Sequence, residues 1–225
     1  MSAETKTTGP DPITTEIVFN ALQSVADESF VALMKSAYST NIKERHDHST
    51  AIVDRDGRLV VQASGSIPIH LASMLGLMQK LLEKYPVSEI HEGDVFCAND
   101  PHVGGGTHLP DVNLAMPVFS DGELVGFVCN IAHHADVGGI APGSMPPFST
   151  SLEEEGVQFR NIKIMAGGKF LAAETRPVLA SKPWPARTPD QYIHDLHPQL
   201  ASYPHASHAL RQPAAVYRLS AVTAH

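Results

Sequence analysis

The sequence predicts an α+β fold: a long N-terminal helix, then β-hairpins and a mixed sheet that carries a metal site in glycine-rich loops, then an irregular C-terminal tail. Three observations predict it. Apolar residues recur at helical spacing in two segments, runs rich in β-branched residues surround turn signals, and His and Asp side chains gather in loops rich in glycine. A chain of 225 residues with 43% hydrophobic content can bury one sizeable core, so one principal domain is expected.

Two segments have the periodicity of amphipathic helices. Residues 12–39 carry apolar side chains three and four positions apart, and Pro12 stands where a proline fits the first turn of a helix. Residues 70–85 show a similar stripe, and Pro86 ends it because proline cannot continue a helix. We therefore expect a long first helix and a shorter second one. The stripe of the second helix consists of Leu71, Met74, Leu75, Met78, Leu81 and Leu82.

Five segments are typical of strands, and turn residues pair four of them into hairpins. The runs STAIVD and RLVVQAS flank Asp56-Gly57, a dipeptide that favours a two-residue hairpin turn. The runs DVNLAMPVF and ELVGFVCNIAHH are joined through Ser120-Asp121-Gly122. The fifth run is DVFCAND. Glycine-rich loops over 99–110 and 137–147 follow these strands, and loops held on a strand scaffold are where binding groups tend to lie.

The composition changes after Gly168, because all 16 glycines lie at or before this position and the residues beyond it are rich in Pro, Ala and His. We therefore expect a flexible N-terminus over 1–11, a metal-binding domain over 12–168, and a tail over 169–225 that is aberrant or partly disordered. Within the tail, only residues 188–201 have a helical pattern. Two interpretations stay open: a natural helical and linker extension, or a terminus altered by truncation or a change of reading frame.

The composition excludes several classes of function. The net charge of −8 and the pI near 5.9 argue against nucleic-acid binding, because phosphate contacts need clustered Lys and Arg. No segment is expected to have the roughly 18 apolar residues of a membrane span. The first residues lack the apolar core of a secretory signal, so a cytoplasmic protein without membrane association is expected. Cys97 and Cys129 stand singly in apolar surroundings and are predicted to be small core residues.

Histidines and aspartates concentrate in and beside the glycine-rich loops. His108 and Asp111 precede the first strand of a predicted hairpin and His133 ends the second, so the hairpin brings them to the same end. Side chains alternate faces along a strand, so His133 and His134 cannot both face one ion. One of the two is expected to be a ligand and the other to orient a ligand or contact a substrate. The seven candidates are Asp100, His102, His108, Asp111, His133, His134 and Asp136.

These residue types suit the hydrolysis of an unreactive amide. Such a reaction needs an activated water and a group that stabilises the electrophile, and a divalent metal held by His nitrogens and carboxylate oxygens supplies both. The run Gly104–Gly106 permits close approach of a ligand to main-chain N–H groups, but it lacks the GK[ST] ending of a phosphate-binding loop. On these grounds alone, the polar segment ERHDHS at 44–49 is interpreted as a solvated loop.

Three segments resemble the hydantoinase B/oxoprolinase family: NIKERHDHSTAIVDRDGRLV, NDPHVGGGTHLPDVNLAMPVF and GFVCNIAHHADVGGIAPGSMPPFSTSLEEEGV. The resemblance extends over about residues 12–168 and implies a bound metal. The ligands that it implies are Asp47, His108, Asp111 and His133. Two His and two Asp form a mixed nitrogen and oxygen set that suits Mn, Fe or Zn. His134 and Asp136 would then be the catalytic candidates, as groups that orient a ligand or contact the substrate.

The resemblance also implies a division of labour within a hetero-oligomer. A hydantoinase A-like partner would use ATP to phosphorylate the carbonyl oxygen of a cyclic amide, with 5-oxoproline or a hydantoin as the substrate. This chain would then open the activated ring with water activated by the metal, as a hydrolase. One alternative is a subunit of the acetone carboxylase type, which joins an activated ketone to a carboxyl group. Because family members are much longer, a truncated N-terminal portion is expected, and a metal-binding remnant without activity is the other alternative.

Overall fold

The computed structural model describes residues 12–211 and confirms the α+β class with its long N-terminal helix. Seven strands form one sheet in the order β2-β1-β5-β4-β3-β6-β7. Every neighbouring pair is antiparallel, where the sequence pattern suggested a mixed sheet, because short turns that reverse the chain join several of the neighbours. The strands are β1 (His48–Asp54), β2 (Leu59–Gln62), β3 (Val95–Ala98), β4 (Asp111–Ser120), β5 (Glu123–His133), β6 (Ile162–Ala166) and β7 (Lys169–Phe170).

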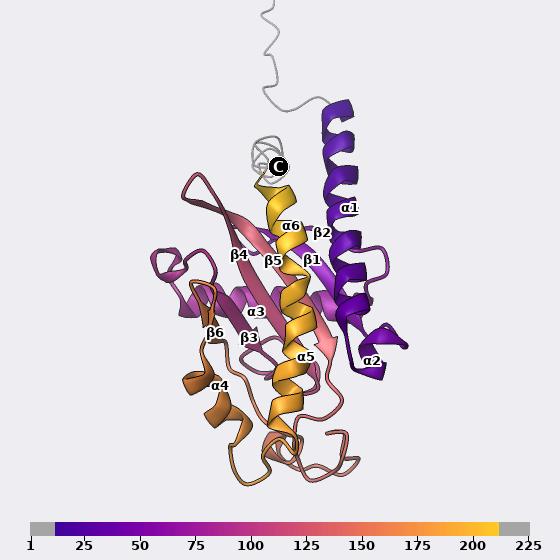
Figure 1. The fold of residues 1–225 in the computed structure, drawn as a ribbon, viewed down its shortest axis with the longest axis vertical. Helices are drawn as coiled ribbons and strands as arrows, with labels where there is room; N and C mark the ends of the chain where they lie inside the picture. The colour runs from indigo at the N-terminus through magenta and orange to yellow at the C-terminus, as the bar shows by residue number, and fades with distance from the viewer. Residues whose placement is uncertain (1–11, 212–225) are drawn as a thin grey trace, which may run out of the picture.

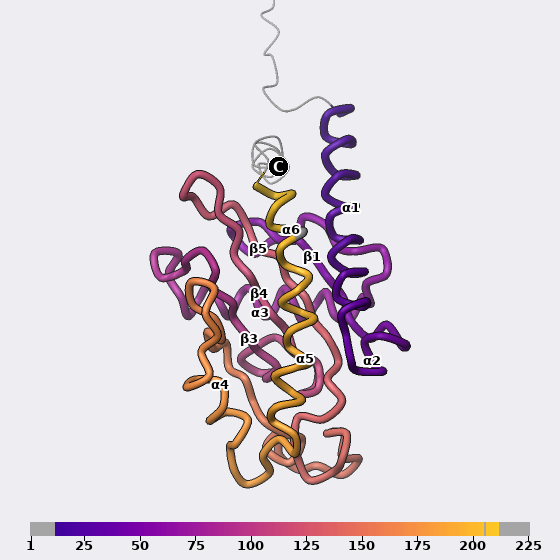
Figure 2. The backbone as a smooth tube through the Cα atoms, viewed as in Figure 1, coloured from indigo at the N-terminus to yellow at the C-terminus, as the bar shows by residue number. Residues whose placement is uncertain are grey.

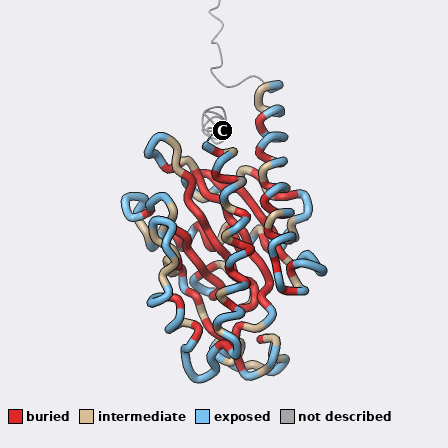
Figure 3. Tube along the Cα trace, viewed as in Figure 1, coloured by how far each residue is buried: buried red, intermediate tan, exposed pale blue. Residues whose placement is uncertain are grey.

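Helices cover both faces of the sheet (Figure 1). One face is crossed by α3 (Pro68–Lys84), and the other carries α1 (Pro12–Ser36), α5 (Pro189–Ala201) and α6 (Tyr203–Leu210). The tube in Figure 2 shows α5 and α6 running over the central strands beside α1. The central strands are therefore buried on both sides, as Figure 3 shows. The smaller elements are α2 (Thr40–Lys43), α4 (Ala172–Leu179) and the 3-10 turns Val87–Glu89 and Leu152–Glu154.

Both predicted hairpins are confirmed. The turn between β1 and β2 holds Gly57 at φ +80°, and the turn between β4 and β5 holds Asp121 and Gly122 at positive φ. Two successive positive φ angles match the twist of the flanking strands. Along the first half of β4, Val112 faces the core beneath α1 and α5, whereas Ala115 faces α3. The turns and a shift of register in each hairpin together decide which side chains share a face.

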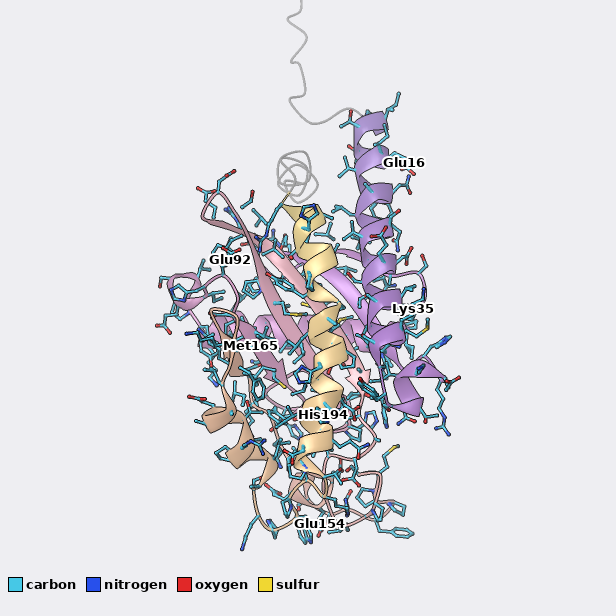
Figure 4. The ribbon with its side chains drawn as sticks, in the orientation of Figure 1. Glu16, Lys35, Glu92, Glu154, Met165 and His194 are labelled. Carbon is cyan, nitrogen blue, oxygen red and sulfur yellow. The ribbon has the colours of Figure 1, made fainter. Side chains whose placement is uncertain are left out.

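Among residues 12–211, α1 is the one helix that could cross a membrane by its length and composition. This differs from the sequence prediction that no segment has such a composition. A core helix of a soluble fold passes the same test, and Val18 and Leu22 of α1 are buried in the core above the sheet. Glu16 and Lys35, towards its two ends, are exposed (Figure 4). The apolar character of α1 therefore matches its place as a packed layer of this fold.

Residues 172–210 form three helices where an irregular tail was expected. The predicted helix over 188–201 is confirmed as α5, and α6 follows it directly. Pro189 and Pro204 stand in the first turns of α5 and α6, where a proline needs no hydrogen-bond donor. Pro177 and Pro198 lie inside α4 and α5, so the abundance of proline does not prevent helix formation. Tyr192 on α5 is buried in the core cluster that also contains side chains of β4 and β5.

The loop before β4 lies directly on α3 at Gly105. A Cβ at this position would lie 2.2 Å from the backbone nitrogen of Leu77 and 2.4 Å from the carbonyl carbon of Gly76, and φ is +78°. Gly105→Ala is therefore expected to lower the free energy of unfolding by roughly 4 kcal/mol, because the loop must separate from the helix. In Gly143→Ala, φ is +80° but nothing lies within 4 Å, so only the backbone penalty of about 1–2 kcal/mol applies. Urea unfolding compares the two variants, and equal losses would contradict the close-packing argument.

Candidate metal centre

Three strand ends meet at one edge of the sheet. β4 begins at Asp111, which pairs with His133 at the end of β5, and β1 begins at His48, which pairs with Ala132. Asp47 directly precedes β1, and its carbonyl oxygen accepts a hydrogen bond from the His133 N–H at 3.0 Å. The antiparallel register thus brings Asp47, Asp111 and His133 together although they lie far apart in the sequence.

The glycine-rich loop before β4 supplies His108. Asn99 braces this loop from inside the core: its amide donates to the carbonyl oxygens of Leu109 at 2.8 Å and Val157 at 3.0 Å. Its Oδ1 accepts a hydrogen bond from the Phe159 N–H at 2.7 Å. Because every polar atom of the buried Asn99 side chain has a partner, the loop has a fixed position, and His108 projects from its end beside Asp111.

Asp111 is the centre of the cluster. Its carboxylate lies 3.0 Å from His108 Nδ1 and 3.2 Å from His133 Nδ1, and it accepts a hydrogen bond from the Thr107 hydroxyl at 3.0 Å. The carboxylate of Asp47 lies 3.7 Å from His133 Nδ1. One possible ligand atom each from His108, Asp111 and His133 lies within 4.8 Å of the other two, so a single ion between them can contact all three.

Burial and hydrogen bonding act in opposite directions on Asp111. Burial favours the neutral acid, but hydrogen bonds from His108 and His133 outweigh it and hold the pKa of Asp111 well below its usual range. The same contact raises the pKa of His108 despite its burial. In the metal-free protein, the contribution of Asp111 to stability is lost as pH falls through its lowered pKa. The contribution of His108 is complete below the ordinary pKa of histidine and is lost as pH rises through its raised pKa.

The cluster forms part of the wall of an open pocket of about 560 Å³. A pocket of this size accommodates a small molecule. Around the polar cluster, the wall includes the apolar side chains of Ile67, Ile69 and Met145 and the cationic side chain of Arg45. The lining of the pocket therefore combines charged and apolar side chains.

The donor set fits a divalent metal. Two carboxylates, from Asp47 and Asp111, face imidazole nitrogens at close range, and mixed carboxylate and imidazole donors suit Mn, Fe and Zn. A bound cation would neutralise the negative charge that these carboxylates bring together. Cys97 and Cys129 are buried in the core, as predicted, and burial raises the pKa of both thiols, so neither is disposed to act as a thiolate ligand.

The predicted catalytic residues His134 and Asp136 do not join the cluster. Strand alternation turns His134 to the opposite face of the sheet, where its side chain is buried and its Nε2 lies 2.9 Å from Gln199 Oε1 on α5. The carboxylate of Asp136 organises its own loop by accepting hydrogen bonds from the Gly138 N–H at 2.8 Å and from Arg187 at 2.9 Å.

Two further candidates also lie apart from the cluster. Asp100 accepts a hydrogen bond from the backbone N–H of His102 at 2.8 Å and pairs with Arg160 at 2.8 Å, so it stabilises the start of the glycine-rich loop. The side chain of His102 is exposed. Of the seven candidates in the stretch 100–136, the structure therefore brings together His108, Asp111 and His133, and it adds Asp47 from outside that stretch.

His70, in the first turn of α3, was missed by sequence reasoning and joins the cluster. Its Nε2 lies 3.6 Å from Asp47 and 3.8 Å from Asp111, and Asp47, His70 and Asp111 form a second group with possible ligand atoms within 4.8 Å of one another. The one signal in the sequence was a histidine at the start of an otherwise apolar helical stripe. Burial lowers the pKa of His70, although the two nearby carboxylates oppose that effect.

Comparison with known proteins identifies the family to which the chain belongs. The family model for hydantoinase B/oxoprolinase matches residues 11–225. The 5-oxoprolinase of Dictyostelium discoideum is 40% identical over 200 residues, which cover 89% of this chain and 15% of the relative. A Pseudomonas protein described as a candidate B component of a D-/L-hydantoinase is 35% identical over 161 residues, which cover 70% of this chain and 27% of the relative.

Two solved structures share the fold. An ATP-dependent caprolactamase from Pseudomonas jessenii superimposes with a TM-score of 0.81 at 29% identity and covers 96% of this chain, which matches 37% of the caprolactamase chain. A nucleotide-free acetone carboxylase superimposes with a TM-score of 0.76 at 22% identity over 89% of this chain and 26% of its own, which shows a shared fold alone. The chain thus spans well under half the length of each of these relatives. Because the family match extends over nearly all of the sequence, the chain belongs to the hydantoinase B/oxoprolinase family.

Proposed function

We propose that this chain is the metal-holding part of an ATP-dependent cyclic amidase that hydrolyses a lactam or hydantoin ring such as 5-oxoproline. The observation that carries the proposal is the cluster of His and Asp side chains in the wall of an open pocket. We further propose that the metal is Mn, Fe or Zn, that a hydantoinase A-like partner phosphorylates the ring carbonyl with ATP, and that the two form a cytoplasmic hetero-oligomer. The residues proposed to hold the metal are Asp47, His108, Asp111 and His133.

The degree of similarity favours hydrolysis over carboxylation. The relatives named as a 5-oxoprolinase and as a hydantoinase component are 40% and 35% identical to this chain, whereas the acetone carboxylase is 22% identical. The caprolactamase, at 29% identity, is named as ATP-dependent, which supports a reaction coupled to ATP.

The side chains of the pocket suit this reaction. A divalent metal supplies two things when bound, an activated water and polarisation of the carbonyl group that is attacked. Asp47 and Asp111 provide the negative charge that holds a cation, and His108 and His133 provide nitrogen donors whose positions are set by the loop and by β5. The apolar side chains of Ile67, Ile69 and Met145 would pack against the carbon atoms of a ring.

Adjacent histidines offer a direct test of the site. His133→Ala is expected to remove bound metal, whereas His134→Ala is expected to keep it, because the two side chains lie on opposite faces of the sheet. The measurement is metal content per folded chain after loading with Mn²⁺ or Zn²⁺ and removal of free ions, with circular dichroism as the check on folding. Equal loss from both folded variants, or loss from neither, would overturn the site assignment.

The activity is tested with the full chain, a hydantoinase A-like partner, ATP and either 5-oxoproline or hydantoin. We expect ring opening that requires both proteins and ATP and that is lost in His108→Ala. Acetone and bicarbonate in the same assay test the alternative, since formation of a carboxylated product without ring opening would favour a carboxylase. Bound metal without either reaction would favour an inactive remnant.

A further inference from the structure

His70 lies between the metal cluster and a buried hydroxyl group. Its Nε2 faces Asp47 at 3.6 Å and Asp111 at 3.8 Å, and its Nδ1 lies 2.9 Å from the hydroxyl oxygen of Ser49 on β1. The same hydroxyl oxygen accepts a hydrogen bond from the backbone N–H of Ile67, just before α3, at 2.8 Å. His70 therefore has one ring nitrogen directed at two carboxylates and the other held by the scaffold.

The contacts of Ser49 decide which nitrogen of His70 carries the proton. Ser49 is fully buried, and within residues 12–211 its hydroxyl group contacts only the Ile67 N–H and His70 Nδ1. If Nδ1 carried the proton, the hydroxyl oxygen would accept twice and its own proton would have no acceptor, which costs about 1–3 kcal/mol in a buried place. If the hydroxyl donates to Nδ1, every group is satisfied. The proton of the neutral imidazole then resides on Nε2.

We infer that His70 is a positioning residue of the metal centre and not a ligand, because Ser49 holds it as the tautomer whose Nε2–H points at Asp47 and Asp111. In this tautomer Nε2 has no lone pair for a metal, and its N–H faces the carboxylates of Asp47 at 3.6 Å and Asp111 at 3.8 Å. Asp47 precedes β1 and Asp111 begins β4, so one N–H from α3 faces two carboxylates at the starts of different strands. This inference rests on the proposed metal centre.

The tautomer is measured in the metal-free full chain by NMR of ¹⁵N-labelled histidine side chains, near pH 8, where a neutral imidazole is expected. The signal of His70 is assigned by its loss in His70→Gln. We expect a protonated Nε2 and an unprotonated Nδ1 in the native chain and a mixture of both tautomers in Ser49→Ala. The matched control is Ser66→Ala, which removes hydroxyl contacts to Thr50 close to the same junction without touching His70. A protonated Nδ1 in the native chain would overturn the inference.

Metal binding separates a positioning residue from a ligand. With Co²⁺ as the probe, His70→Ala is expected to weaken binding by about 10-fold to 100-fold, as the loss of an outer partner does. His70→Gln, which can keep an N–H donor at this place, is expected to restore most of that loss and leave the visible spectrum of the bound Co²⁺ unchanged. Loss of binding in His70→Ala as complete as in His108→Ala, or a changed spectrum of the bound Co²⁺ in His70→Gln, would mean that His70 is a ligand. If the native chain binds no Co²⁺ at all, the proposed function fails, while the NMR measurement still decides the tautomer.

Discussion

Replacing Asp111 by Asn is expected to abolish binding of a divalent metal, with an affinity loss of more than about 100-fold, the upper end of what the loss of an outer partner costs. The carboxylate of Asp111 contacts both His108 and His133, and it also faces His70. Asn keeps the shape of the side chain and removes its charge. The variant therefore tests the charge at the centre of the cluster with little change in packing.

Asp94→Asn is the matched control. Asp94 is as buried as Asp111, at 2% exposure, but it lies just before β3, where it pairs with Lys163 at 2.7 Å. Isothermal titration with Mn²⁺ or Zn²⁺ is expected to give one binding site in Asp94→Asn and none in Asp111→Asn. Equal binding by the two variants would exclude Asp111 as a ligand.

The parts of the site that the sequence predicts are those set by local geometry. The turn at Asp121-Gly122 predicts the hairpin of β4 and β5 and so brings Asp111 near His133, whereas their exact pairing also depends on a shift of register between Val118 and Phe119. Alternation along a strand separates His134 from His133, which the sequence predicts without choosing the ligand. Local periodicity also predicts α1, α3 and α5, because each carries an apolar stripe that the sheet covers.

The parts that the sequence does not predict depend on contacts between distant elements. Asp47 lies in a polar segment that is typical of a solvated loop, so among the sequence signals only the family resemblance predicts its place in the site. In the structure, the pairing of β1 with β5 brings it there. His70 arrives with α3, whose position over the sheet has no local signature. The helices α4 and α6 were also missed, because each is only 8 residues long and too short for a clear period.

The second large effect is a loss of folding stability in acid, which two buried histidines, His134 and His48, are expected to cause. His134 Nε2 donates to Gln199 Oε1, whose amide nitrogen is already engaged with the carbonyl oxygen of Val112 at 2.8 Å. His48 Nε2 donates to the carbonyl oxygen of Phe30 at 3.2 Å. Within the described residues, neither histidine has a partner for Nδ1, so a second proton would create a buried charge without an acceptor. Burial accordingly lowers the pKa of both histidines to about 4.

Acid destabilises the fold because the unfolded chain binds these two protons at a higher pH than the folded chain does. The unfolded chain binds these protons near the ordinary pKa of about 6.5, whereas the folded chain binds them only near pH 4, so stability decreases as pH falls between these values. At about 1.4 kcal/mol for each unit of pKa, each histidine removes about 3 kcal/mol. That is a large share of the roughly 5–15 kcal/mol that stabilises a typical domain.

Glutamine in place of each histidine separates this effect from other causes of acid unfolding, because it can donate from nearly the same place and does not titrate. Urea unfolding of the metal-free chain between about pH 4 and 6.5 is expected to show a shallower dependence on pH in His134→Gln and in His48→Gln, and the shallowest in the double variant. His102→Gln, at an exposed position, is expected to keep the native dependence. The contributions of Asp111 and His108 are common to all these variants and cancel in the comparison. A native slope in His134→Gln would mean that His134 binds its proton in the folded chain as readily as in the unfolded one, and that the face of the sheet beneath α5 is open to water.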